Sequence, residues 1–248
     1  MAETLLSPGV LTRENDQTLV TQGPTTAGAA LLGPTVKGPV NIPTLVTSFS
    51  DYKNKFGGSF ESASIAYEYL TSIAAFNYFQ AGGESILVTR IVSGTYLPAT
   101  ASVAALGTGS DGGDYMTSSF VLETLSQGDI MNNSGSVTTS GSLASGSGDN
   151  IRWEVAGLDS GSGQFSLLIR RGDDNEKNKT ILETFNDLSL DPNSTNYIEK
   201  IIGNQVQNFD TDSDGNRFIQ VTGSFSNNSS FVRVKSVPKP TSELAIVG

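Results

Sequence analysis

The sequence of 248 residues contains neither cysteine nor histidine. The absence of cysteine excludes disulfides, thiol catalysis and thiolate metal sites. The absence of histidine excludes Ser-His-Asp and Cys-His constellations, the usual zinc sites and the commonest general base near neutral pH. Only carboxylate, lysine or backbone chemistry remains. We therefore expect a protein that is not an enzyme and that has no catalytic, cofactor-binding or metal-binding residues.

Basic residues are scarce, with 15 Lys and Arg against 25 Asp and Glu, which gives a net charge of -10. Binding to nucleic acid needs clustered Lys and Arg to neutralise phosphates, so a nucleic-acid partner is not expected. The sequence has no basic amino-terminal region followed by an apolar core, and no hydrophobic run approaches the length of a membrane span. We expect an unprocessed, soluble protein without membrane insertion.

Hydrophobic residues make up 37% of the sequence, and there are 27 glycines among many Ser, Thr and Asn residues. This composition allows a buried core, and it predicts more strands than helices with abundant turns. The expected fold class is α+β. An extended amino-terminal arm precedes a partial α/β sheet domain, and a β-rich, sandwich-like domain with one short helix follows.

Residues 1–24 are expected to form the arm, because they show neither a helical nor a hairpin pattern. A frayed terminus is one interpretation, since termini that nothing holds are commonly disordered. The other is an arm that pairs with a strand of another subunit. The candidate residues of that interface are Ser7, Pro8, Gly9, Val10, Leu11, Leu19 and Val20.

Residues 25–94 are expected to form the partial α/β domain. Apolar runs predict buried strands at residues 27–33, 43–47 and 86–92. A short helix is expected over residues 51–56, with Ser48 or Ser50 as its cap and Gly57 at its end. So few strands do not complete a sheet, and their neighbours must come from elsewhere in the polypeptide or from other copies.

A longer helix is expected over residues 62–80, where apolar residues recur at spacings of three and four. Its aromatic residues surround much of the helix instead of forming one stripe. Ordinary core packing explains this pattern. A helix buried on two sides, by its own domain and by a neighbour, also explains it. The aromatic residues are Tyr67, Tyr69, Phe76, Tyr78 and Phe79.

Residues 95–237 are expected to form the β-rich outer domain, and residues 238–248 a linker towards a domain absent from this chain. Asp191 can cap a helix that begins at Pro192, with Tyr197, Ile198, Ile201 and Ile202 on its buried side and Gly203 at its end. The Gly/Ser-rich run at 141–148 is typical of a flexible connector. Strands are expected at 151–155, 165–169, 179–185, 217–221 and 230–234, and short strands at 120–122 and 130–131.

Two charged segments are candidates for a functional site, one for cation binding and one for a salt bridge. The run Asp210-Thr-Asp212-Ser-Asp214-Gly215 matches the first six positions of a calcium loop, but Val221 stands where that loop needs a bidentate Glu, so an acidic hairpin turn is the alternative. Arg170 and Arg171 stand beside three acidic residues, either in an inter-subunit salt bridge or at a solvated hairpin end. The acidic residues are Asp173, Asp174 and Glu176.

The order of several segments resembles the contractile tail sheath proteins of bacteriophages. They are the arm motif Ser7-Pro8-Gly9-Val10, the segments from Thr26 to Pro34, from Lys37 to Pro39 and from Val46 to Gly57, and Phe185 to Ile202 with Asp191-Pro192-Asn193-Ser194. The resemblance covers most of residues 1–100 and 150–237.

The resemblance implies a virion structural protein, assembled in the host cytoplasm, that polymerises around a tail tube as stacked hexameric rings in a six-start helix. Contraction of such a sheath drives the tube through the host envelope for ejection of the viral genome. The implied partners are other copies of the chain, the tail tube protein, and the baseplate and tail terminator proteins. Neighbouring subunits are implied to exchange strands, and in this chain residues 1–24 would have that role.

The sequence departs from the family at its end, because sheath proteins that resemble it continue into a large α/β domain and a carboxy-terminal domain that contacts the tube. We expect the amino-terminal portion of a longer subunit, and a short sheath-like variant is the alternative. Two functions of other classes remain open. One is a carbohydrate- or receptor-binding virion protein that uses Trp153 and residues 210–215, and the other is a carboxylate-dependent hydrolase.

Overall fold

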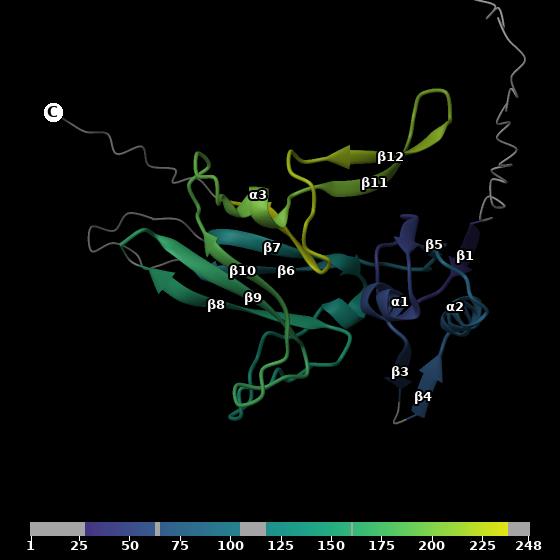
Figure 1. Ribbon diagram of the computed structural model, residues 1–248, viewed down its shortest axis with the longest axis horizontal. Coiled ribbons are helices and arrows are strands. Elements are labelled where there is room, and N and C mark those ends of the chain that lie inside the picture. The colour runs from purple at the N-terminus through teal and green to yellow at the C-terminus, as the bar shows by residue number, and fades with distance from the viewer. Residues whose placement is uncertain (1–27, 63–64, 105–117, 160, 238–248) are drawn as a thin grey trace, which may run out of the picture.

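The structure is a computed structural model that describes residues 28–62, 65–104, 118–159 and 161–237. This part of the chain is a mixed, strand-rich fold with several small sheets and few helices (Figure 1). The expected α+β class is confirmed at this level. The arm at 1–24 and the linker at 238–248 lie outside the described residues.

The first sheet has the strand order β1-β5-β2 and lies beside two helices. The central strand β5 pairs in parallel with β1, with Leu31 opposite Val88, and antiparallel with β2. In Figure 1 the helices α1 and α2 lie next to each other beside this sheet, and the hairpin β3–β4 extends from their other side. The elements are β1 (Ala29–Gly33), β2 (Thr44–Val46), α1 (Phe49–Phe56), β3 (Ser59–Ser62), β4 (Ile65–Glu68), α2 (Leu70–Gln80) and β5 (Ile86–Arg90).

Three further sheets are formed by the rest of the described chain. Their strand orders are β13-β7-β6, β10-β9-β8 and β11-β12, and all their pairs are antiparallel. The elements are β6 (Pro98–Ala104), β7 (Ser118–Gln127), the 3₁₀ turn η1 (Asp129–Met131), β8 (Ile151–Asp159), β9 (Gln164–Arg171), β10 (Ile181–Leu188), α3 (Ile198–Ile202), β11 (Val206–Thr211), β12 (Arg217–Thr222) and β13 (Val232–Ser236).

The larger hydrophobic core lies between the two three-stranded sheets of this second part. Alternate residues of β9 are buried, as expected for a strand that places every second side chain in a core. Phe120 of β7 stacks on Phe165 of β9 with ring centroids 5.6 Å apart. The core also contains Leu122, Leu167, Ile169, Leu188, Tyr197, Ile198, Ile202, Val232 and Val234. The meander β8-β9-β10 expected from the sequence is confirmed.

The helix expected over residues 62–80 is wrong in its first part. Residues 59–62 and 65–68 form the hairpin β3–β4, and α2 begins only at Leu70. Phe60 stacks on Tyr67 and Tyr69, with ring centroids 5.7 and 5.1 Å apart. Tyr67 and Tyr69 are two positions apart, which is the period of a strand and does not place them on one face of a helix. Aromatic cross-strand pairing favours the hairpin.

Two other expectations need correction. Asp191 caps a turn and not a helix, because its Oδ1 accepts a bond of 2.9 Å from the amide of Asn193, and α3 begins only at Ile198. Before α3 the chain pairs with Ser189, the residue that follows β10. The amide of Ile198 donates to the carbonyl of Ser189 (2.9 Å). The expected strand at 130–131 is part of the 3₁₀ turn η1.

Candidate functional site

The sequence predicts an interface in the arm, and its seven residues lie outside the described residues. They are Ser7, Pro8, Gly9, Val10, Leu11, Leu19 and Val20. The structure does describe the sheet behind the arm, which the sequence predicts to be incomplete. In the described ranges, no other strand pairs with the outer edge of β1 or of β2. This sheet is the candidate functional site.

The two edges of the sheet differ in how much of their backbone is occupied. On β2 the carbonyl of Leu45 accepts a bond of 2.9 Å from the Lys55 ammonium. Lysines at edge strands are a common means of blocking the addition of another strand. Strand β1 has no comparable contact from a described side chain, so it is the edge with more room for a further strand.

The two faces of the sheet also differ. Val46 of β2 and Ile86 and Val88 of β5 are buried against the helices, in a core with Tyr52, Phe56 and Ala75. On the other face the apolar side chains are exposed, with Leu32 64%, Leu45 57% and Leu87 41% accessible. The expectation that these strands are buried is therefore wrong for one face within the described chain. Parallel strands are usually covered on both faces.

Local contacts define the ends of α1 and the position of α2 on the sheet. Ser48 caps α1, since its side chain accepts a bond of 3.1 Å from the amide of Asp51. Gly57 ends the helix with a φ of 77°, which favours glycine. Helix α2 lies over β1, where the Thr71 side chain fills the space that a side chain at Gly33 would need. The Thr71 hydroxyl donates to the carbonyl of Pro34 (2.5 Å).

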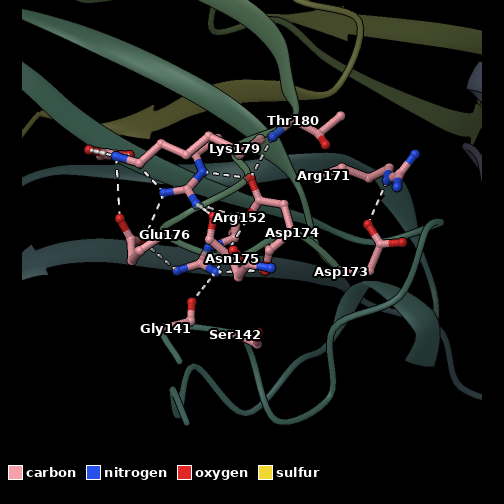
Figure 2. A network of polar contacts seen from close by, with 12 residues as sticks. Gly141, Ser142, Arg152, Arg171, Asp173, Asp174, Asn175, Glu176, Lys179 and Thr180 are labelled. Carbon is pink, nitrogen blue, oxygen red and sulfur yellow. Dashed lines mark hydrogen bonds and ion pairs between the residues drawn. The ribbon is translucent and has the colours of Figure 1, made fainter. Parts of the chain in front are cut away.

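A network of buried charges holds the end of the β9–β10 hairpin (Figure 2). Arg170 binds the carboxylate of Asp174 through two bonds, from Nε to Oδ2 (2.7 Å) and from Nη2 to Oδ1 (2.9 Å). The side chains of both residues are at most 1% exposed. Burial raises the pKa of Asp174, but bonds from Arg170 and from the amide of Thr180 outweigh it and hold the pKa below its ordinary value.

The solvated hairpin end expected from the sequence describes Arg171 and Asp173, but it is wrong for Arg170. Arg170 makes its ion pairs within its own chain, with Asp174, Glu154 and Glu176, and it is not a solvated residue. Figure 2 shows the pair of Arg171 and Asp173 apart from the rest, and both of these side chains are more than a third exposed. Alternation along β9 does not indicate this difference, because it would place Arg171 and not Arg170 on the face of the buried Ile169.

The run at 141–148, expected to be a free connector, contributes to this network. The carbonyl of Gly141 accepts a bond of 2.7 Å from Arg152, which also binds Asp174 (3.3 Å). The side-chain Nδ2 of Asn150 donates to the carbonyl of Ser145 (2.8 Å). These contacts tie the Gly/Ser-rich run to β8, so in this fold it is more than a connector.

Buried polar contacts also join the first sheet to the second part of the chain. Arg90 at the end of β5 donates to the carbonyls of Gly38 (2.8 Å) and Gln127 (2.5 Å). Lys37 lies 3.7 Å from the carboxylate of Asp149, and burial lowers the pKa of Lys37 and raises that of Asp149. No sequence pattern indicates these contacts, because they join segments that are distant along the chain.

The acidic run at 210–215 forms the tip of the hairpin β11–β12. Asp212 Oδ1 accepts from the amides of Asp214 (3.0 Å) and Asn216 (2.7 Å), so this carboxylate organises the turn. These bonds, with that from the Asn216 side chain foremost, lower the pKa of Asp212. Among the residues that the structure describes, no three acidic side chains are grouped to hold a metal ion.

Trp153 lines a groove of about 770 Å³ beside β6 and β8, together with residues of the 131–137 segment. None of residues 210–215 lines this groove. Trp153 also packs against Phe120, with ring centroids 5.8 Å apart. The structure therefore does not bring together in one groove the two features expected of a carbohydrate- or receptor-binding surface.

No known family model matches the chain, and a search of curated proteins finds none that is similar to it. None of the helices in the described ranges is both long and apolar enough to cross a lipid bilayer.

Proposed function

We propose that this chain is a structural subunit of a contractile phage tail sheath. In this proposal it polymerises around the tail tube as stacked hexameric rings, and residues 1–24 of one copy add a strand to the sheet of another. The proposed architecture is an inner, partial α/β domain and an outer, sandwich-like β-rich domain. The partners are other copies, the tube, the baseplate and the terminator.

One observation carries the proposal. In the described chain the sheet β1-β5-β2 has an unpaired outer edge at β1, while Lys55 already occupies a carbonyl of the edge strand β2. Strand addition at an edge relies on backbone hydrogen bonds and tolerates an arm with few side-chain anchors. The arm motif Ser7-Pro8-Gly9-Val10 has this character. The resemblance of segment order described above supplies the identity of the assembly.

The proposed mechanism needs no catalytic residue. An extended sheath stores free energy in a metastable lattice, and a baseplate signal lets each ring rotate and compact. New inter-subunit burial and electrostatic pairing supply the work. Strands exchanged between subunits would keep neighbouring rings connected during this change, since backbone pairing does not depend on the rotation of the outer domain.

Deletion of residues 1–20 tests the role of the arm. Negative-stain electron microscopy of the intact chain and of the deletion variant would compare the length and connection of the polymers. The proposal predicts long polymers for the intact chain and separate rings or dispersed subunits for the variant. Polymers of normal length and inter-ring connection in the variant would overturn the proposed role of the arm. Circular dichroism of both proteins would check that the deletion leaves the fold intact.

A further inference from the structure

Helix α2 presents an apolar stripe that no described segment of its own chain covers. Its buried side contains Thr71, Ser72 and Ala75. Leu70 and Ile73 lie on the opposite side and are 82% and 41% exposed. The exposed residues Leu70, Ile73, Ala74 and Asn77 follow the spacing of one helix face, and Phe76 flanks them.

The absence of charge makes this stripe unusual. An exposed helix face normally carries charged and polar residues. None of the eleven residues of α2, LTSIAAFNYFQ, is charged. A helix without charge on either side is typical of one that is buried on both sides. This is one of the two interpretations that its aromatic pattern left open.

The sheet face that is exposed in the described part of the chain, called the open face below, is a surface of the same kind. Leu87 of β5 lies between Ala30 of β1 and Leu45 of β2, so the three form one apolar row across the sheet. Leu32 lies opposite Thr89 in the next row, and Ile91 follows β5. All of these except Thr89 are exposed, and none is charged.

The stripe of α2 and the open face of the sheet are both uncharged and largely apolar, and they have about the same length. A helix laid on a sheet is a standard layer arrangement, and parallel strands are normally covered in this way on both faces. Eleven helical residues span about 16 Å at 1.5 Å per residue, and five strand residues span about 16 Å as well. One stripe of α2 therefore covers the length of one open sheet face.

The two surfaces cannot meet within one molecule. Helix α2 packs on the covered side of the sheet, and its stripe points away from that sheet, so the stripe and the open face are back to back. We propose that the stripe of α2 in one copy packs onto the open sheet face of the next copy. The contact joins two different surfaces, and each copy has one of each, so it extends head to tail into a ring or an open stack.

This inference rests on the proposed function and deepens it, because it names the surfaces through which neighbouring subunits pair. It is independent of the arm, which would join subunits through a sheet edge. Since neither surface carries a charge, the contact should persist in high salt, in contrast to one held by ion pairs.

Engineered disulfides test the contact directly, because the chain has no cysteine of its own. The double variant Ile73→Cys/Leu87→Cys places one thiol on each surface. Mild oxidation is expected to give a ladder of dimers, trimers and longer products on non-reducing gels. The matched control Ile73→Cys/Leu158→Cys has its second thiol on an exposed residue of β8, and at least tenfold less product is expected.

A charged variant and its control test the contact in a way that does not depend on misfolding of the double-cysteine variant. Ile73→Glu places a charge in the stripe, and Asn54→Glu places the same charge at an exposed position of α1, outside the stripe. In a chain with Leu87→Cys and Asn77→Cys, Asn54→Glu should leave the ladder unchanged. Ile73→Glu, in a chain with Leu87→Cys and Asn77→Cys, should reduce the ladder at least tenfold with an unchanged thermal melting curve.

The outcomes separate the two proposals. Polymers in the electron microscope with no ladder would overturn the contact between α2 and the sheet and leave the proposed function standing. Dispersed monomers with no ladder at any concentration would overturn both. A ladder of equal strength in the Leu158→Cys control would show non-specific collision and would also overturn the contact.

Discussion

At the scale of residues, two adjacent arginines show how burial changes the role of a charge. Arg170 is fully buried and makes a bidentate pair with Asp174, whereas Arg171 pairs with Asp173 at the surface. A buried carboxylate without its partner is strongly destabilising, while exposed ion pairs contribute little. The same residue type should therefore have very different effects on stability at these two positions.

We expect Arg170→Met to lower the free energy of unfolding by about 3 kcal/mol, because it removes the bidentate partner of the buried Asp174 and leaves only the longer pair with Arg152 (3.3 Å). Urea denaturation followed by the fluorescence of Trp153 would measure the change. The matched variant Arg171→Met should change the same free energy by no more than about 1 kcal/mol. Equal losses in the two variants would contradict the network of Figure 2.

At the scale of elements, helix boundaries follow from single capping residues. The sequence offers Ser48 and Ser50 as caps of the first helix, and the structure selects Ser48, whose side chain binds the amide of Asp51. Ser50 lies inside α1 and is exposed. A capping serine satisfies an amide at the start of the helix that would otherwise lack a partner.

Ser48→Ala should therefore lower the free energy of unfolding by about 1 kcal/mol. Ser50→Ala is the control, and it should leave stability unchanged or raise it slightly, since alanine is the better helix former. Thermal melting followed by circular dichroism would give both values. A larger loss for Ser50→Ala than for Ser48→Ala would show that the helix begins elsewhere.

The elements that the sequence predicted well are those with a local cause. Helix α1 has its cap and its glycine, and the meander β8-β9-β10 has alternating strands between turns. The failures have non-local causes. The hairpin β3–β4 forms through the stacking of Phe60 on Tyr67, which the helical spacing does not reveal. Strands β6 and β11 were missed because their alternation is weak, and pairing with β7 and β12 defines them.

The candidate site was predictable in part for the same reason. A shortage of strands in residues 25–94 follows from the sequence, and the sheet β1-β5-β2 has three strands. Two further features depend on tertiary packing. One is the sheet face that the helices cover, and the other is the contact of Lys55 with the edge strand β2. Continuous apolar runs predicted strands buried on both faces, whereas Leu32, Leu45 and Leu87 are exposed in the described chain.

At the scale of the whole molecule, the described chain consists of a small layered unit and a larger β-rich part. Buried contacts of Lys37 and Arg90 with Asp149 and Gln127 join the two. The first unit leaves an edge, a sheet face and a helix stripe available, and the second buries its main core between two of its own sheets. Our account assigns self-assembly to the first unit.

The central claim is that this chain assembles with copies of itself. Sedimentation velocity of the purified 248-residue chain over a hundredfold range of concentration, at low and high salt, measures this most directly. The account predicts species that grow with concentration well beyond a dimer and persist in high salt, with hollow polymers in electron micrographs of the same samples. A single monomeric species at every concentration would contradict it.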